Sequence, residues 1–317
     1  MSRASLILLA VLLVPACLVG CGGRPPDQPG VSTAGTGLTG KIIFCSNRRG
    51  NEDIYVLTLS PVSTVRVINH PAKDRHPVWS PDGTKFAFVS DRSGPWQIWL
   101  ANADGTGVTR LTHSGKCDTD PAWSPDGSRL AFARWDPDPD VHTHFICTVN
   151  ADGSGARRIT ALEGYCYDPD WAPDGSRIAY TARNADGNVD IYTMNASDGS
   201  GRTRLTNDPA PDSQPKYSPD GGRIVFTSGR GGAGSSRLSP HSLWIMQATG
   251  AGEVPVGAGM SDDSAVWSPD GQHLAFNGYG SPGGFDLYSI RPNGTERTQL
   301  NSSAGYNQSP SWWQPAP

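Results

Sequence analysis

The chain carries little net charge, which excludes one large class of function. Its 317 residues include 26 lysines and arginines against 30 aspartates and glutamates, a formal net charge of −4. The basic residues are scattered, so the clustered positive surface of a nucleic-acid binder is missing. We therefore expect no nucleic-acid partner.

Catalytic sequence motifs are also missing. The sequence contains no GxSxG, no HExxH and no glycine loop of the kind that binds phosphate. Its six cysteines include no CxxC and no Cys/His pair at zinc-binding spacing. These patterns predict no catalytic residue, no metal and no cofactor.

No hydrophobic run is long enough to cross a membrane as a helix. The longest, LILLAVLLVPACLVG, has about 15 residues and is followed by a cysteine, Cys21. Its end, LVGC, resembles the lipobox of bacterial lipoproteins, which implies that residues 1–20 are a signal peptide and that Cys21 is acylated. An ordinary secretory signal is the alternative. Residues 21–40 are rich in Gly, Pro, Ser and Thr and are expected to be a flexible tether. The protein would then be anchored to a membrane, facing the periplasm or the cell exterior.

A repeat is what the sequence has in abundance. Segments similar to DPAWSPDGSRLAF recur every 44 to 50 residues. Their aromatic positions are Trp79, Trp123, Trp171, Tyr217, Trp267 and Trp312. Each unit has four apolar runs, here called A to D in chain order, separated by Gly/Pro/Asp clusters. Repeats of this length made of short strands are typical of propeller blades, so each unit is predicted to be a four-stranded antiparallel meander.

The SPDG element between runs A and B has the residues that a type I turn prefers. We interpret its serine and aspartate as turn chemistry rather than as a repeated active site. The aromatic residue before it is expected to fill the space between neighbouring blades.

The ends of the chain predict how the ring closes. Six B runs can be counted, but the first, at Lys41, has no A run before it. A final A run at residues 310–312 has no B run after it. We therefore predict an all-β, six-bladed propeller over residues 41–317, in which the C-terminal strand completes the first blade and removes the open sheet edges.

The unit DPAWSPDGSRLAF…ICTVNADGSGARRIT resembles the WD-like propeller repeat of the TolB family, over residues 41–317. Related repeats occur in prolyl-oligopeptidase-type peptidases and in oligogalacturonate lyases. The resemblance implies the propeller fold, and such propellers serve many roles. A monomeric propeller is expected. TolB carries an α/β domain ahead of its propeller, whereas only a short linker precedes Lys41 here. The peptidases carry a hydrolase domain, for which we see no counterpart.

One group of candidate ligand-binding residues lies three positions before each aromatic residue of run A. These residues are His76, Asp120, Asp168, Gln214, Ser264 and Ser309. Equivalent positions on a closed ring form a circle, so they are expected at one mouth of the central channel. Asp120 and Asp168 would be neighbours there, which could raise the pKa of one carboxyl or hold a cation. The alternative is that these side chains only bond loop backbone and channel water.

A second group lies in the B–C connections, which differ in length between blades and are expected on one face. The longest belong to blades 3 and 5. Their candidate binding residues are Arg134, Asp136, Asp138, Asp140, His142, His144, Arg230, Arg237 and His241. The alternating Asp and His residues of blade 3 could hold a cation, but the loop lacks a calcium-loop glycine, so a solvated polar loop is favoured. Arg48, Arg92, Arg183 and Arg230 recur after run B, and blade-to-blade contacts are expected of them.

Two of the remaining cysteines could form a disulfide. Cys117 and Cys166 occupy successive D–A connections and would come from adjacent blades. Cys45 and Cys147 fall within strands and are expected to be buried thiols.

Two functions remain open at the level of sequence. The first is a cell-envelope lipoprotein whose propeller is a non-catalytic binding scaffold for a protein, peptide or glycan. The second is a metal-dependent carbohydrate-active lyase or hydrolase with its site at the channel mouth, for which the ring offers a single histidine, His76.

Overall fold

The computed structural model describes residues 37–136, 138, 143–160, 165–184, 186–230, 241–257, 261–281, 284–302 and 305–315. These residues form six four-stranded antiparallel sheets and contain no helix. Blades 1 and 2 consist of β24 (Asn307–Trp313), β1 (Lys41–Ser46), β2 (Asp53–Leu59) and β3 (Val62–Ile68), then β4 (Asp74–Trp79), β5 (Lys85–Ser90), β6 (Gln97–Asn102) and β7 (Thr109–Arg110). Blades 3 and 4 consist of β8 (Cys117–Trp123), β9 (Arg129–Trp135), β10 (His144–Asn150) and β11 (Arg157–Arg158), then β12 (Cys166–Trp171), β13 (Arg177–Arg183), β14 (Val189–Asn195) and β15 (Thr203–Arg204). Blades 5 and 6 consist of β16 (Asp212–Tyr217), β17 (Arg223–Ser228), β18 (Ser242–Gln247) and β19 (Val254–Pro255), then β20 (Asp263–Trp267), β21 (Leu274–Ser281), β22 (Gly284–Ile290) and β23 (Thr298–Gln299).

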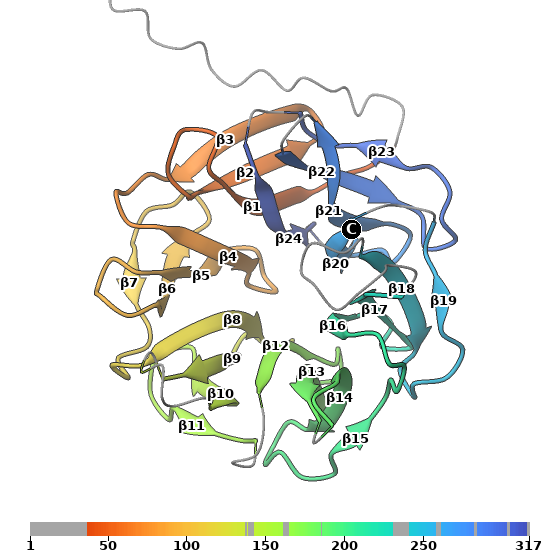
Figure 1. Ribbon diagram of the computed structural model, residues 1–317. Coiled ribbons are helices and arrows are strands. Elements are labelled where there is room, and N and C mark those ends of the chain that lie inside the picture. Colours follow the sequence, from red (N-terminus) through yellow and green to blue (C-terminus); the bar gives the residue numbers. More distant parts are fainter. Residues whose placement is uncertain are drawn as a thin grey trace, which may run out of the picture.

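The blades are arranged around a central axis, with the first strand of each sheet innermost (Figure 1). Blade 1 is the exception in chain order, because its inner strand β24 comes from the C-terminal end. β24 pairs antiparallel with β1, from Lys41 opposite Trp313 to Ser46 opposite Asn307. The predicted six-bladed ring and its closure are confirmed.

The SPDG elements fold as tight turns held by their own side chains. In blade 2, the Ser80 hydroxyl donates to Asp82 Oδ1 at 2.6 Å, and the same oxygen accepts the Thr84 N–H at 3.0 Å. Gly83 has φ +65°, in the left-handed region that favours glycine. The Ser–Asp bond repeats at Ser124, Ser218 and Ser268. The interpretation of these residues as turn chemistry is therefore supported in four blades.

The tryptophans of the inner strands connect neighbouring blades, as predicted. The Trp123 indole of blade 3 donates to the Val78 carbonyl of blade 2 at 3.3 Å. The Trp267 indole of blade 6 donates to the Lys216 carbonyl of blade 5 at 3.1 Å. Buried hydrophobic clusters combine residues of adjacent blades, so the core is a set of interfaces between sheets rather than one central mass.

The C–D turns also contact the preceding blade. In blade 4 this contact leaves room only for glycine, because a side chain would clash with the backbone of that blade. Gly199 of blade 4 has φ +76°, and a Cβ at this position would lie 1.8 Å from the Ile159 carbonyl oxygen of blade 3. Gly187, in the B–C loop of the same blade, has φ +87° but no atom within 4 Å of the equivalent point.

This pair of glycines gives a test of blade-to-blade packing. Gly187→Ala should cost about 1 kcal/mol, because alanine must adopt a left-handed backbone. Gly199→Ala should cost about 3 kcal/mol, because the same strain is joined by a clash with the backbone of the preceding blade. Urea unfolding of the two variants measures the difference. Equal losses of stability would show that the C–D turn does not hold the blades together.

Candidate functional site

The inner strands share one backbone irregularity. Eight non-glycine residues of the described chain have positive φ, and six of them occupy the equivalent positions of the six inner strands. These six are His76, Asp120, Asp168, Gln214, Ser264 and Ser309, with φ between 46° and 56°. In every blade the register of the inner strand shifts at this point, so one extra residue is accommodated on the inner strand. Such bulges re-aim side chains, and here they repeat around the axis.

All six left-handed residues line one pocket, here called the ring pocket, with a volume of about 470 Å³. Its remaining wall comes from the ends of the inner strands and from the prolines of four turns, Pro81, Pro173, Pro219 and Pro269. The pocket therefore lies toward the face of the uniform A–B turns and away from the variable B–C loops. The prolines of these turns thus do more than shape them, because they form the rim of the pocket.

The charged half of the ring pocket contains an ion pair. His76 Nδ1 lies 2.7 Å from Asp120 Oδ1, and the Thr119 hydroxyl donates to Asp120 Oδ2 at 3.1 Å. Burial opposes the charged form of both side chains. Their mutual hydrogen bond and attraction outweigh it, raising the pKa of His76 and lowering that of Asp120.

Asp168 is the neighbouring carboxyl, and its surroundings stabilise the ionised form less than those of Asp120 do. Burial and then the negative charge of Asp120 raise the pKa of Asp168 to about 7, although Lys216 and His76 pull it down. Its hydrogen bond from the Thr181 hydroxyl is long, at 3.4 Å. One carboxyl of this pair is therefore ionised at neutral pH while the other is near half-protonation, as expected for like charges that share a site.

A second layer of polar residues lies one position before the inner-strand aromatics. Lys216 Nζ is 3.2 Å from Asp170 Oδ1, and the Tyr217 N–H donates to Asp170 Oδ2 at 2.9 Å. Burial raises the pKa of Asp170, against the effect of Lys216. The sequence reasoning missed Lys216 and Asp170, although their repeated position next to the aromatic residue was available as a signal.

On the other side of the ring pocket the left-handed residues, Gln214, Ser264 and Ser309, are uncharged. Gln214 Nε2 donates to the Ser264 hydroxyl at 3.0 Å, and Gln214 Oε1 accepts the Thr227 hydroxyl at 3.0 Å. Trp313 and Gln314 line the rim where the other blades have serine or alanine and proline of the turn. The pocket thus combines an ionised side, an amide and hydroxyl side, and an aromatic and proline rim.

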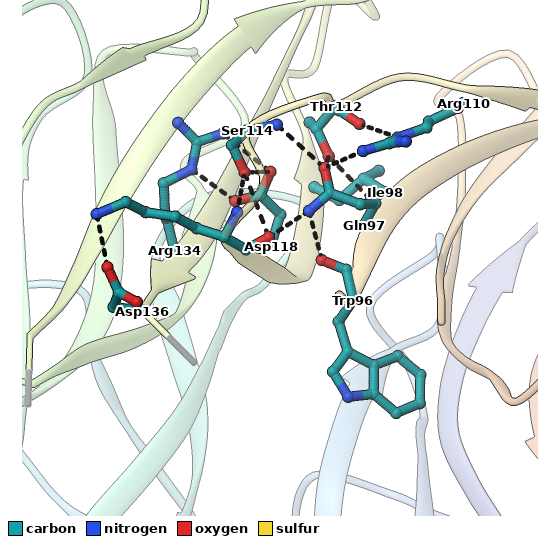
Figure 2. Close-up of polar contacts among 10 residues, drawn as sticks. Trp96, Gln97, Ile98, Arg110, Thr112, Ser114, Asp118, Arg134 and Asp136 are labelled. Atoms are coloured by element: carbon teal, nitrogen blue, oxygen red, sulfur yellow. Dashed lines mark hydrogen bonds and ion pairs between the residues drawn. The ribbon is translucent and has the colours of Figure 1, made fainter. Parts of the chain in front are cut away.

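The arginine and aspartate predicted as ligand-binding in blade 3 have partners within the protein. Arg134 forms two hydrogen bonds to the fully buried Asp118, at 2.6 and 2.9 Å. Asp136 forms an ion pair with Lys116 at 2.9 Å. Figure 2 shows this network, in which the buried Gln97 also accepts hydrogen bonds from Arg110, Thr112 and Ser114. These contacts fix the D–A connection and occupy both predicted side chains.

Arg230 of blade 5 is similarly occupied. Its guanidinium lies 2.6 Å from buried Asp212, contacts Glu253, and lies over the Trp244 ring at 4.7 Å. Arg48 and Arg92 donate to Asn307 and Asp74 of their own blades, both at 2.7 Å. Arg183 lies 5.0 Å from the Tyr165 ring, which belongs to the same blade. The contacts described for Arg48, Arg92 and Arg183 lie within one blade, whereas Arg230 also lies 3.5 Å from Asp208 in the connection that leads from blade 4, so the expected blade-to-blade contacts are found only in part.

The remaining loop candidates are dispersed. His144 stacks on Trp135 at 5.7 Å and contacts Tyr165 at 5.1 Å, whereas His241 lies beside blade 6, where its carbonyl accepts the Asp262 N–H at 3.1 Å. Asp138 is exposed. Asp140, His142 and Arg237, together with Cys21 and the predicted signal peptide, lie outside the described residues. Their roles stay predictions.

The four described cysteines are buried free thiols, so the predicted Cys117–Cys166 disulfide is not formed. Both residues begin inner strands rather than lying in loops. Burial raises the pKa of Cys45, Cys147 and Cys166 to about 11. Cys45 and Cys147 are buried as predicted.

The described residues hold neither a cluster of metal ligands nor a membrane-spanning helix. No group of three or more His, Cys, Asp or Glu side chains there is arranged to hold a metal ion. No helix in the same residues is long and apolar enough to cross a membrane.

Comparison with known proteins identifies the family. The TolB beta propeller domain model (PD40) matches residues 36–150 and 121–238. The chain belongs to this family. No curated protein matches it.

Solved structures show the same fold at low sequence identity. TolB from Acinetobacter baumannii is 20% identical with a TM-score of 0.71, and the match covers 86% of this chain and 66% of that one. A protein assigned as TolB from Agrobacterium tumefaciens is 23% identical with a TM-score of 0.66, covering 86% and 92%. An oligogalacturonate lyase in complex with manganese is 14% identical with a TM-score of 0.58, covering 83% and 74%. The chain thus spans just under two thirds of the Acinetobacter protein.

The ring pocket predicts a pH dependence of stability. An unfolded Asp titrates near 3.8, so the folded protein with a pKa of about 7 at Asp168 loses stability as pH rises toward and through 7. The raised pKa of His76 acts in the same direction, because its stabilisation is complete below 6.5 and is lost as pH rises through the folded value. Asp168→Asn should reduce the loss between pH 5 and pH 8 by about 1 to 2 kcal/mol.

Asp174→Asn is the matched control, six positions along the same blade. Hydrogen bonds from Ser176 lower the pKa of Asp174, so its stabilisation is complete above pH 5 and its removal should act equally at pH 5 and pH 8. Thermal unfolding at both pH values measures the difference. An unchanged pH dependence in Asp168→Asn would contradict the raised pKa.

Proposed function

We propose that this protein is a non-catalytic binding scaffold of the cell envelope, which binds a segment of a protein, peptide or glycan in the ring pocket. The observation that carries the proposal is the circle of six left-handed residues. A left-handed backbone costs a non-glycine residue about 1 kcal/mol or more, yet none of the six positions is glycine. The fold keeps this geometry in every blade despite its cost, and all six residues line the pocket.

The size and lining of the ring pocket support this kind of ligand. A volume of about 470 Å³ falls within the range of small-ligand sites and admits a few residues or one or two sugar rings. The rim of tryptophan and proline can contact apolar side chains or the flat faces of sugars. The inner ring offers carboxylates, an imidazole and an amide, which can fix the orientation of a polar group.

The alternative function is a metal-dependent lyase or hydrolase acting in the same pocket. It is favoured by the fold shared with a manganese-bound lyase and by the close placement of His76 and Asp120. The imidazole and the carboxylates of Asp120 and Asp168 would be the ligands, although the His76–Asp120 ion pair competes with the metal for them.

Site-specific photo-cross-linking in intact cells tests the binding proposal. A photoreactive residue replacing Ser309 lies in the ring pocket, whereas one replacing Val65 lies on the outer strand β3, where the side chain is 58% exposed. We expect a discrete cross-linked product from position 309 and none from position 65. Asp168→Asn should reduce the yield severalfold, because it replaces an ionisable carboxyl of the inner ring with a neutral amide.

Two results would contradict the binding proposal. Equal products from both positions would show nonspecific contact. Stoichiometric binding of Mn²⁺ by the purified protein, abolished by His76→Ala, together with cleavage of an oligosaccharide, would establish the enzymatic alternative.

The envelope location rests on the LVGC sequence at residues 18–21. We expect the wild-type protein to incorporate an alkyne-labelled fatty acid and to fractionate with membranes, because acyl chains bury their methylenes in the bilayer. Cys21→Ser should abolish the labelling, whereas Cys17→Ser, within the predicted signal peptide, should leave it unchanged. Labelling that survives Cys21→Ser would disprove the assignment of this cysteine.

A further inference from the structure

A second concave site lies between blades 5 and 6, away from the channel. This groove, here called the inter-blade groove, has a volume of about 410 Å³. Its walls come from strands β17 to β19 of blade 5, and from the A–B and C–D turns of blade 6. Arg223 and Arg291 lie on opposite walls, and no aspartate or glutamate is among the lining residues. The groove is therefore a site of positive charge on a protein of net negative charge.

The arginine of blade 5 has no polar partner, unlike its counterpart in blade 4. Arg177 donates to the Thr193 hydroxyl, to Asn195 Oδ1 and to the Gly201 carbonyl, at 3.0 to 3.2 Å. Within the described residues, the Arg223 guanidinium makes no hydrogen bond or ion pair, and it lies 4.6 Å over the Trp267 ring. Stacking holds the group in place and leaves its N–H edges available.

The amide at the end of strand C is also unused in blade 5. In blade 3, the Asn150 amide donates to the Ser154 hydroxyl at 2.9 Å and closes the C–D turn. In blade 5 the corresponding residues are Gln247 and Ala251, and alanine offers no hydroxyl. The Gln247 side chain is exposed and has no partner among the described residues, so its amide can face a ligand in the groove.

A third departure keeps the groove open. In blade 3, Arg157 of strand D reaches across to the Ser197 carbonyl in the C–D turn of blade 4. The residue at this place in blade 5 is Val254, whose side chain is 52% exposed and makes no such bridge to the turn of blade 6. The contacts of Arg177 and Arg157 are each seen in one other blade, and among the described residues neither they nor the amide–hydroxyl bond of the C–D turn is present at the interface of blades 5 and 6.

We propose that the inter-blade groove binds a compact organic anion, a carboxylate or a phosphate, through the Arg223 guanidinium. A guanidinium recognises either group with paired hydrogen bonds, and its stacking on Trp267 pre-organises it. Arg291 adds a second positive charge from the facing wall, although its Nε forms an ion pair with Glu296 at 2.8 Å. Gln247 binds a hydroxyl of the ligand, and Val254 contacts its apolar body. This site is independent of the ring pocket.

Titration of the full-length purified protein with inorganic phosphate, glucuronate and neutral glucose tests the proposal, followed by the NMR signals of arginine Nε–H groups. We expect saturable binding of phosphate or glucuronate and none of glucose, and the preferred anion identifies the chemistry. Arg223→Gln should weaken binding at least tenfold, because a charge-assisted contact is lost. Arg129→Gln is the matched control, since Arg129 lies over Trp171 at 4.9 Å in the equivalent stack outside the groove.

The expected result is an unchanged affinity in Arg129→Gln, within about twofold. Gln247→Leu should weaken binding about threefold and serves as a second variant if Arg223→Gln fails to fold, because Gln247 is exposed. The proposal is overturned if neither anion saturates below about 10 mM. It is also overturned if Arg129→Gln weakens binding as much as Arg223→Gln, or if glucose binds as well as the anions.

Discussion

The pairing of β24 with β1 is the contact on which the rest of the molecule depends. It joins residues 263 positions apart, as in the Cys45 thiol that donates to the Gln308 carbonyl, and it places Ser309 in line with the five other left-handed residues. Without it, blade 1 would lack its inner strand and β1 would expose an unpaired edge. The same strand brings Trp313 to the rim of the ring pocket. The pairing of β24 with β1 therefore both closes the ring of blades and completes the ring pocket.

Six strained residues on a closed ring constrain each other. A single left-handed aspartate could relax by a shift of its strand, but each inner strand here is hydrogen-bonded to a second strand and packed against the next blade. The bulge repeats with the same one-residue excess in every blade, so relaxing one position would displace the tryptophan three residues later and the interface that it fills. The rigidity of the scaffold pre-organises the pocket and lowers the entropic cost of holding a ligand.

The architecture could be predicted from the sequence because the same aromatic residue and turn recur in each repeat. The spacing of Trp79, Trp123 and the later aromatics indicated the blades, and the unpaired runs at Lys41 and Trp312 indicated the closure. The ring of six residues could be found by counting from the aromatics. Its left-handed backbone could not, since only glycine would have signalled positive φ, and these positions hold His, Asp, Gln and Ser. Arg134 and Arg230 were taken as ligand-binding because Asp118 and Asp212 lie 16 and 18 residues away, on a strand whose pairing is visible only in three dimensions.

A repeat protein satisfies its polar groups with the same few contacts in each unit, so a departure from the repeat changes what a group can do. The Ser–Asp bond of the turns, the asparagine–hydroxyl bond of the C–D turns and the arginine–carboxylate pairs all keep side chains occupied within the scaffold. Where the sequence departs from the repeat, a side chain loses its hydrogen-bond partner. The backbone keeps its conformation, because the neighbouring blades still impose it. At the inner ring the departures are the side chains His76, Asp120 and Asp168 on a backbone common to all blades. Chemical specificity in this fold thus arises from local asymmetry placed on a symmetric and rigid frame.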